Sequence, residues 1–173
     1  MTKVAISSTS NPLLKRYRKL KSGAKRSRER ATVVEGIAPV WQAVENADVE
    51  TVFVSRDLLQ SEAGHKLVDR ARASGAEIVE LTGDAFGSIA DRDNPAGLAA
   101  IVARPEPSLD DLVVETDSMF VVLADVASPG NLGTIVRTAD AARAAVIVTG
   151  ESTDPWHPAA VKASMGQSID KSR

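Results

Sequence analysis

The sequence predicts an α/β protein with two unequal units, each built from strands that alternate with helices. Three observations support this prediction. Short apolar segments recur between segments whose apolar residues have helical spacing, a pattern typical of a sheet covered by helices. A proline-containing acidic stretch at residues 105–117 interrupts the alternation and is interpreted as a linker. After it, only two further apolar segments and two helical segments follow in residues 118–173.

Residues 1–104 are expected to form one α/β/α unit with a mostly parallel sheet. Asn11 can cap the free amides of a helix and Pro12 suits the first helical position. Apolar residues then continue at helical spacing, so a basic helix is predicted over about residues 12–28. Strands are predicted at 31–35, 50–54, 76–81 and 98–102, helices at 39–46, 58–75 and 82–89, and a loop at 91–97.

The second unit is predicted to be too small to stand alone. Its expected elements are strands at 119–124 and 145–149 and helices at 131–142 and 159–164. Both strands are apolar throughout, which is typical of strands covered on both faces. A two-stranded sheet is at best marginally stable. We therefore expect this unit either to pair with another chain or to lack sequence that normally completes it.

Composition narrows the class of protein. The chain has 173 residues, of which 43% are hydrophobic and 25% charged, and these values argue against disorder, collagen or coiled coil. Cysteine is absent, which excludes disulfides, thiolate catalysis and Cys-based metal sites. No apolar run approaches the ~20 residues of a membrane span, and the first residues lack the apolar core of a signal peptide. A cytoplasmic protein without a membrane partner is therefore expected.

Charge is distributed unevenly along the chain. Residues 1–30 hold ten Lys or Arg side chains and one acid, whereas the other 143 residues hold 11 basic and 22 acidic side chains. Clustered cations gain free energy by releasing counterions from phosphates. The segment therefore favours a nucleic-acid partner over a solvated helix face or a membrane-surface helix. The candidate binding residues are Lys15, Arg16, Arg18, Lys19, Lys21, Lys25, Arg26, Arg28 and Arg30.

Residues 125–142 carry the most specific pattern. A turn after a buried strand, with Asn131 as the cap of the next helix, places Asn131 and nearby amides at the carboxyl edge of a sheet, where ligands of α/β proteins bind. Arg137 follows within two helical turns and can reach the same edge. The glycine spacing fits neither a P-loop nor a dinucleotide fingerprint, so a site and a purely structural capped helix remain equal interpretations of these residues alone. The loop residues concerned are Ser128, Pro129, Gly130 and Gly133.

The segment Ser128-Pro-Gly-Asn-Leu-Gly-Thr-Ile-Val-Arg-Thr-Ala-Asp-Ala-Ala142, taken in order, resembles motif one of the SpoU (TrmH-type) RNA ribose 2′-O-methyltransferases of the SPOUT superfamily. The resemblance covers nearly the whole chain. Residues 6–15, Val33-Val-Glu-Gly36 and Asn94-Pro-Ala-Gly97 recur upstream in the family's order, and residues 154–166 resemble the segment that follows motif one.

The resemblance implies a fold and a reaction. Residues 1–104 would be a ribosomal-protein-like α/β/α domain that binds ribosomal or transfer RNA, and residues 118–173 would begin a SPOUT-type (trefoil-knot) α/β domain. Asn131 and Arg137 match motif-one residues at the reaction centre. They are therefore candidate catalytic residues for methyl transfer from S-adenosylmethionine to a ribose 2′-hydroxyl. Ser128 departs from the family, where many members have Asp, and Glu35 matches an acid typical of the N-terminal domain.

The family's later motifs, which build the cofactor pocket and much of a homodimer interface, have no match after Gly166. We therefore expect a C-terminally truncated chain that binds S-adenosylmethionine weakly or not at all. A homodimer is expected for the full-length form. A non-catalytic RNA-binding module is the main alternative, because it needs no cofactor. A flavodoxin-like binder of small molecules is disfavoured, because no phosphate-binding loop follows the first strand.

Other polar residues are given structural interpretations. His65 and His157 belong to no ligand-spaced cluster and are interpreted as surface or capping residues, so no metal site is predicted. Asp91 and Asp93 fit turn chemistry, and Trp156 fits a packing role. The sequence leaves open which RNA is the substrate: transfer RNA, 23S ribosomal RNA or an antibiotic-resistance target.

Overall fold

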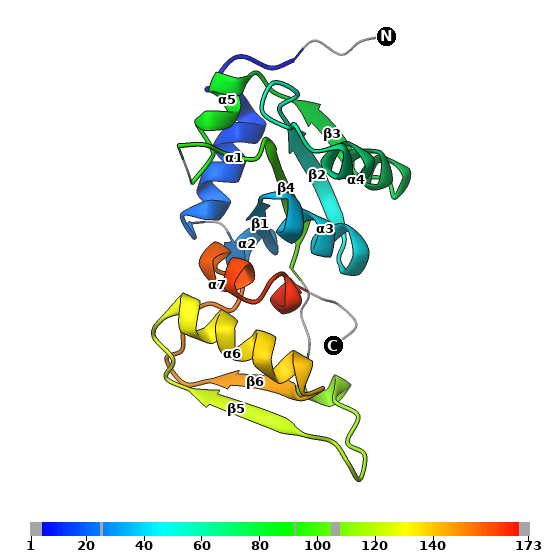
Figure 1. Cartoon of the computed structure of the whole chain (residues 1–173). Coiled ribbons are helices and arrows are strands. Elements are labelled where there is room, and N and C mark those ends of the chain that lie inside the picture. The colour runs from blue at the N-terminus through cyan, green and yellow to red at the C-terminus, as the bar shows by residue number, and fades with distance from the viewer. Residues whose placement is uncertain (1–4, 25, 92, 105–107, 170–173) are drawn as a thin grey trace.

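The chain forms two units that meet at helix α7 (Pro158–Ala163), as Figure 1 shows. The computed structural model describes residues 5–24, 26–91, 93–104 and 108–169. The elements of the first unit are α1 (Pro12–Lys21), α2 (Arg26–Glu29), β1 (Ala31–Glu35), α3 (Ile37–Asn46), β2 (Val49–Val54), α4 (Glu62–Ala73), β3 (Glu77–Glu80), α5 (Gly83–Gly87) and β4 (Leu98–Ala103). The second unit contains η1 (Leu109–Asp111), β5 (Phe120–Ala124), α6 (Pro129–Ala141), β6 (Ala145–Thr149), α7 and η2 (Gln167–Ile169).

The first unit is the expected α/β/α sandwich. Alternate residues of β4 face opposite cores: Ala99 and Ile101 pack beneath α1 and α5, whereas Ala100 and Val102 pack beneath α3 and α4. On the α1 side the rings of Tyr17 and Phe53 meet edge to face with centroids 5.6 Å apart. Because both faces of the sheet are covered, most residues of β1, β2 and β4 are buried.

The prediction of a mostly parallel sheet was wrong. The strand order is β1-β4-β2-β3, and β4 runs antiparallel to both β1 and β2, whereas only β2 and β3 are parallel. After β3 the chain stays at one end of the sheet, where α5 lies (Figure 1). It therefore re-enters the sheet from that end, in the opposite direction. An apolar run identifies a buried strand but carries no information about its direction.

Two helix boundaries also differ from the predictions. The basic helix predicted over residues 12–28 is divided into α1 and α2, because Ser22 caps α1 and Gly23 adopts a left-handed φ of +91° that ends it. The helix predicted from residue 58 begins only at Glu62, where the side chain of Ser61 accepts a hydrogen bond from the Gly64 amide. The apolar residues before it lie in a turn rather than in the helix.

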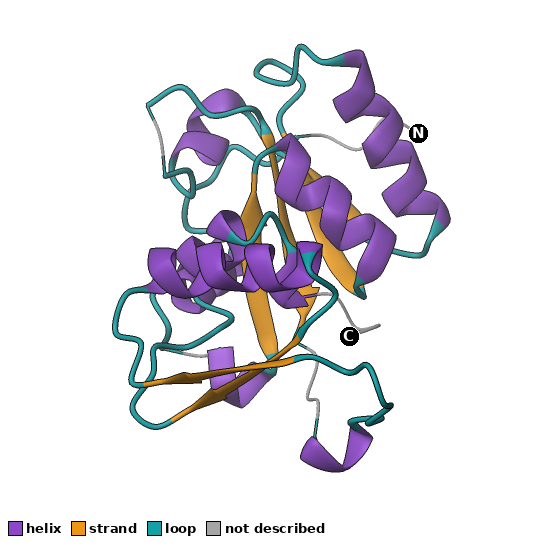
Figure 2. Cartoon of the chain, turned by 60° about the horizontal axis from the view of Figure 1, so that its bottom comes forward, coloured by secondary structure: helices purple, strands orange, loops and turns teal. Residues whose placement is uncertain are grey.

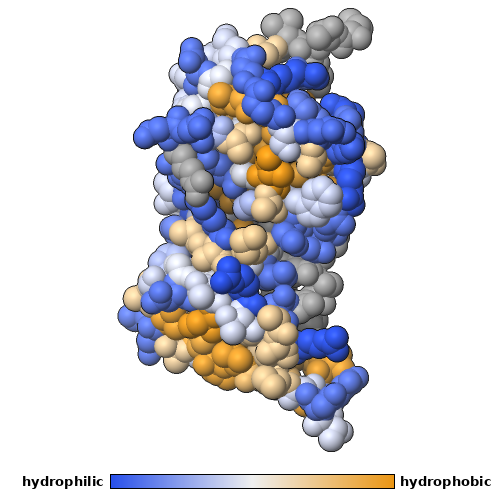
Figure 3. Space-filling view, viewed as in Figure 1, coloured by the Kyte–Doolittle hydropathy of each residue, from blue (hydrophilic) through white to orange (hydrophobic). Residues whose placement is uncertain are grey.

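The second unit contains a parallel pair of strands with one covered face. Helix α6 packs over β5 and β6 through a small cluster that includes Leu123 and Leu132. On the opposite face Val122 is 61% exposed, and nearby Met119 is 55% exposed. Figure 3 shows hydrophobic surface gathered over the part of the molecule where Figure 1 draws β5. The prediction of strands covered on both faces is therefore not met within the described residues.

Helix α7 belongs in sequence to the second unit but also packs against the first. Its Val161 is buried in the core formed with α3 and α4, and its Ala160 joins the core beneath α6. Figure 2 shows α6 and α7 between the two sheets. The domain boundaries predicted at 104 and 118 remain predictions, since residues 154–169 contact both units.

Candidate active site

The loop between β5 and α6 is held in place at the carboxyl ends of both strands of the second sheet. Asp125 has a left-handed φ of +56°, a conformation that Asp tolerates better than most residues. Its Oδ1 accepts a hydrogen bond of 2.8 Å from the Glu151 amide, in the loop after β6. A Cβ on Gly150 would overlap this carboxylate. The two loops are therefore joined where ligands of parallel sheets bind.

A second set of bonds extends this junction toward α6. The Val126 amide donates to Ser152 Oγ at 3.0 Å, and the Thr153 amide donates to the Val126 carbonyl at 2.8 Å. Ser152 Oγ in turn donates to the carbonyl of Thr149, the last residue of β6. Because both sides of the loop are bonded, the start of α6 has a defined place relative to the sheet.

Ser128, rather than Asn131, caps helix α6. Ser128 Oγ accepts a weak hydrogen bond of 3.4 Å from the Asn131 amide, and Pro129 occupies the first helical position. The prediction that Asn131 is the cap was therefore wrong, because the helix starts earlier than the Pro-Gly pair suggested. The side chain of Asn131 is left free for another role and is exposed.

The two candidate catalytic side chains lie on the exposed side of α6. Asn131, Thr134 and Arg137 are spaced three residues apart, so they follow one row along the helix surface, and all three are exposed. Asn131 and Arg137 are separated by about 9 Å along the axis and about 120° around it. Thr134 lies between them, and its hydroxyl donates to the Gly130 carbonyl.

The two glycines of the segment have different surroundings. A Cβ on Gly133 would overlap the Ala160 carbonyl oxygen and lie 2.8 Å from the Ala163 Cβ. Gly133 therefore permits the close approach of α6 and α7. The nearest atom to a Cβ on Gly130 would be Ser128 Oγ at 3.9 Å, so no close approach requires a glycine there.

The nine predicted nucleic-acid-binding residues differ in how far their side chains are exposed. Lys15, Lys19, Arg28 and Arg30 are exposed. Three others are partly exposed and hold protein partners: Arg16 pairs with Glu29 and Glu50, Arg18 donates to the Thr9 carbonyl and Ser88, and Lys21 pairs with Asp91. Lys25 lies outside the described residues.

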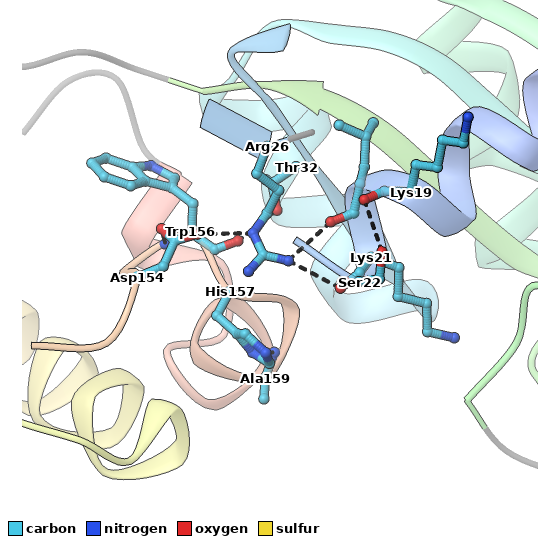
Figure 4. Close-up of polar contacts among 10 residues, drawn as sticks. Lys19, Lys21, Ser22, Arg26, Thr32, Asp154, Trp156, His157 and Ala159 are labelled. Carbon is cyan, nitrogen blue, oxygen red and sulfur yellow. Dashed lines mark hydrogen bonds and ion pairs between the residues drawn. The ribbon is translucent and has the colours of Figure 1, made fainter. Parts of the chain in front are cut away.

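Arg26 differs from the rest of this group. It is only 6% exposed and forms an ion pair of 2.8 Å with Asp154 of the second unit. Figure 4 shows its guanidinium between the end of α1 and the loop before α7. A surface role in nucleic-acid binding is therefore incompatible with its position in this structure.

Comparison with known proteins agrees with the order of these elements. Residues 11–100 match the model of the MRM3-like substrate binding domain, and residues 118–170 match that of the SpoU rRNA Methylase family. The chain belongs to the proteins with an MRM3-like substrate binding domain, and it carries a SpoU methylase family domain after it. Its motif-one segment is the loop and helix α6 described above, and its substrate-binding unit is the sandwich that carries α1.

Two curated relatives are methyltransferases of 23S rRNA. The 23S rRNA (guanosine(2553)-2′-O)-methyltransferase RlmP of Bacillus subtilis is 27% identical over 93% of this chain and 60% of the relative. The 23S rRNA (uridine(2479)-2′-O)-methyltransferase of Streptomyces viridochromogenes is 30% identical over 82% of this chain and 50% of the relative. The chain thus spans half to about three fifths of the length of these relatives.

Solved SpoU structures share the fold. An AdoMet-bound rRNA methyltransferase from Sinorhizobium meliloti superposes with a TM-score of 0.83 at 30% identity, covering 96% of this chain and 62% of that one. The SpoU methyltransferase AviRb from Streptomyces viridochromogenes, also in complex with AdoMet, gives a TM-score of 0.79 at 28% identity, over 91% and 60% of the two chains. The predicted SPOUT-type fold class is confirmed.

Two cavities lie away from the loop at residues 125–131. One is beside Glu35 and Lys162, at the junction of the two units, and the other is beside His65 on α4. Neither is lined by a residue of the loop at 125–131. Neither cavity is therefore placed to hold S-adenosylmethionine beside this loop.

Glu35 lies at the junction of the units, beside the first of these cavities. Burial raises the pKa of Glu35 above its usual value; the charge of Asp91 adds to this effect, whereas the Asp91 backbone amide, Lys21 and Lys162 oppose it. The Asp91 amide donates to Glu35 Oε2 at 2.9 Å. This carboxyl has protein partners, which is consistent with a structural role for the acid that resembles the family pattern.

The remaining polar predictions are structural. His157 Nδ1 accepts a hydrogen bond from the Ala159 amide and caps α7. Of the two interpretations, surface or capping residue, the capping role is the one observed. Trp156 packs against the first core with the guanidinium of Arg104 over its ring at 3.9 Å. Within the described ranges, no group of three or more His, Cys, Asp or Glu side chains could hold a metal ion.

Sequence reasoning missed Asp125, Thr134 and Asp154. The partner of Asp125 is 26 residues away and that of Asp154 is 128 residues away, so no local pattern could identify either pair. The three-residue spacing of Thr134 with Asn131 and Arg137 was a usable signal, once the helix start was placed at Pro129.

None of the helices in the described ranges has the length and apolar character needed to cross a bilayer.

Proposed function

We propose that this chain acts in the 2′-O-methylation of ribosomal RNA, with S-adenosylmethionine as the methyl donor. The observation that carries the proposal is the exposed row of Asn131, Thr134 and Arg137, which directly follows a loop held at the carboxyl edge of the sheet. Similarity to 2′-O-methyltransferases of 23S rRNA supports ribosomal RNA over transfer RNA.

The first unit supplies the RNA-binding surface in this proposal. Lys15 and Lys19 lie one helical turn apart on the exposed side of α1, and Arg28 is exposed on α2. Such side chains contact phosphates without reading bases. Arg16, Arg18 and Lys21 are partly exposed, and their protein partners restrict how far they can reach toward a phosphate.

The row on α6 supplies the ribose-facing groups. Methyl transfer to a 2′-hydroxyl requires that the hydroxyl be aligned for in-line attack and that its proton be removed. The Asn131 amide can both donate to and accept from a ribose oxygen. An Arg side chain, with a pKa above about 12, is a poor base. Arg137 is therefore assigned to holding the neighbouring phosphate and stabilising the developing alkoxide.

Two finer features belong to the same proposal. A homodimer is supported by the exposed apolar face of β5, where Val122 is 61% exposed, because large exposed apolar patches mark interaction sites. A cytoplasmic location is supported by the intracellular nature of the proposed substrate. Sedimentation equilibrium of wild type and Val122→Thr tests the first feature, and a monomeric wild-type chain contradicts it.

A chimera tests the proposed activity. This chain replaces the matching part of the Bacillus relative, and transfer of labelled methyl groups to 23S rRNA transcripts is measured, with 2′-O-methylation located by resistance to alkaline hydrolysis. We expect Arg137→Lys to abolish transfer while RNA affinity is retained, because Lys does not reproduce the planar fork of Arg. Arg143→Lys, in the turn after α6, is the matched control. Equal transfer by Arg137→Lys contradicts the assignment.

A non-catalytic RNA-binding module is the second candidate function. It is favoured because neither of the two cavities described above is lined by a residue of the loop at 125–131. The same chimera distinguishes the two functions. RNA binding without methyl transfer, by a chimera that binds S-adenosylmethionine, favours the module.

A further inference from the structure

The guanidinium of Arg26 joins the end of the basic helix α1 to the second unit. Its Nη1 donates to the carbonyls of Leu20 and Lys21, in the last turn of α1, at 2.9 and 3.0 Å. Its Nε donates to Asp154 Oδ2 at 2.8 Å. Figure 4 shows these bonds converging on one side chain. Because Arg26 is only 6% exposed, its guanidinium is shielded from solvent and from an RNA strand on the surface, whereas the Asp154 side chain is 30% exposed.

Asp154 is itself fixed in the loop that precedes α7. Its Oδ1 accepts from the Trp156 amide at 2.9 Å, and its carbonyl accepts from the His157 amide at 2.9 Å. The Trp156 carbonyl accepts from Thr32 Oγ1 of β1 at 2.6 Å. Asp154 therefore presents a carboxylate of defined orientation to Arg26, and the same loop is bonded to the sheet of the first unit.

The connection continues without a gap from α7 to the candidate site. The Ala160 carbonyl lies against Gly133 of α6, so the two helices are in backbone contact. On the other side, the Thr153 amide, adjacent to Asp154, bonds to Val126 in the loop before α6. Both routes lead from Asp154 to the helix that carries Asn131 and Arg137.

We propose that Arg26 and Asp154 are a positioning pair that sets the distance between the RNA-binding face of α1 and the Asn131–Arg137 row of α6. The pair thereby determines which nucleotide along a bound RNA reaches α6. This inference rests on the proposed function, because it takes RNA as the ligand of α1. It assigns to Arg26 a role in selecting the target nucleotide and not in binding the RNA directly.

Charge and shape make this pair suited to positioning. An Arg with a planar fork can bond to two helix carbonyls and a carboxylate at once, whereas Lys or Gln cannot span all three. Removal of one partner leaves a charge without its counterpart in a shielded place. The junction then loses its preference for a single geometry, although Thr32 and Trp156 still join the units.

Distances between the two units test the pair without RNA. The chain contains no cysteine, so Ala63→Cys on α4 and Ala141→Cys on α6, both exposed in wild type, provide specific attachment points for spin labels. We expect one narrow distance distribution in wild type and its loss in Asp154→Asn. The Asn variant keeps an acceptor for the Trp156 amide and is therefore milder than Arg26→Gln, which serves as the second variant. Lys19→Gln, with the same loss of charge as Arg26→Gln but an exposed position, should leave the distribution unchanged.

Cleavage of bound RNA tests whether the pair selects the nucleotide. An iron chelate attached at Ala141→Cys, one turn from Arg137, generates radicals that cut RNA close to α6. We expect a short cluster of cuts on a 23S rRNA transcript with wild type, and a displaced or dispersed cluster with Asp154→Asn at unchanged RNA affinity. Lys19→Gln should lower affinity without moving the cuts.

The outcomes separate this proposal from the proposed function. A narrow distance distribution and an unmoved cleavage cluster in both Asp154→Asn and Arg26→Gln overturn the positioning role. If wild type binds no RNA, the proposed function fails and nucleotide selection fails with it. Even if no RNA is bound, a broadened distance distribution in Asp154→Asn or Arg26→Gln would show that the pair holds the two units in one relative position. Lower RNA affinity in folded Arg26→Gln, with unchanged distances and cuts, assigns Arg26 to RNA binding instead and overturns the inference.

Discussion

The backbone carbonyl of Ala160 occupies the space in which a Cβ on Gly133 would lie. Helices α6 and α7 therefore touch through their backbones at this point. Gly133→Ala should force them apart and lower the free energy of unfolding by about 1–3 kcal/mol, the usual cost of overpacking. Urea denaturation of the wild type and the variant measures this difference.

Gly130→Ala is the control for this substitution. It changes the same residue type in the same helix, but the nearest atom to the added Cβ is 3.9 Å away. We expect unchanged or slightly higher stability, because Ala favours helix over Gly. Equal midpoints for the two variants would show that the α6–α7 contact adjusts without cost.

Exposed lysines of α1 should contribute to RNA affinity through phosphate contacts. Lys15→Gln and Lys19→Gln are each expected to weaken binding across unrelated RNA sequences and to reduce the slope of log K against log salt by about 1. Lys66→Gln on α4 also removes an exposed charge, one that is paired with Glu62. Fluorescence anisotropy at several salt concentrations gives the slopes, and a reduction in the Lys66→Gln slope of the same size would contradict a localised RNA face.

Protonation of His157 should destabilise the fold. Burial, followed by the charge of Arg26, lowers the pKa of His157 below its usual 6.5, while Asp154 opposes the shift. The folded chain therefore binds this proton less readily than the unfolded chain. The stabilisation is complete above about pH 6.5 and is lost as the pH falls through the lowered pKa.

His157→Asn isolates this effect, because Asn can also cap α7 but does not titrate. Urea midpoints measured at about pH 7.5 and about pH 5 should fall more in wild type than in His157→Asn. His65→Asn, at an exposed position on α4, is the control and should behave as wild type. If the urea midpoint falls equally in wild type and His157→Asn, protonation of His157 does not cause the loss of stability at low pH.

Glu35 should give a pH dependence of the opposite sign. Burial raises its pKa above 4.5, so its contribution to stability is complete below that value and is lost as the pH rises through the raised pKa. Glu35→Gln should abolish this loss and keep an acceptor for the Asp91 amide. Glu80 provides a contrast with the opposite sign. Its hydrogen bond with Arg56 lowers its pKa, so its contribution to the stability of the fold is lost as the pH falls. Stability curves of Glu35→Gln that decline with pH as steeply as wild type would refute this assignment.

S-adenosylmethionine should bind this chain weakly or not at all. Neither of the two cavities beside Glu35 and His65 is lined by a residue of the loop at 125–131. Isothermal titration of the chain measures this, with the chimera described above as the positive control. A micromolar dissociation constant for the chain alone would contradict the prediction.

Strand positions and covered helix faces were predictable because the apolar residues that become buried recur at regular spacings in the sequence. Each strand of the first sheet was located to within one or two residues, and so were β5 and β6. The direction of β4 was not predictable, because antiparallel and parallel strands buried on both faces have the same apolar pattern. The cap of α6 was misplaced by three residues, since Ser128 and Asn131 are both good capping residues.

By itself, the sequence determined the α/β class, the family motif and the presence of a basic segment, because these depend on residue types and on short spacings. The tertiary structure decided which basic residues remain available. Arg26 is indistinguishable from Lys19 in a count of charges, but it is buried against Asp154, 128 residues away. Pairing over such a separation depends on how the two units pack, and neither propensity nor periodicity records that packing.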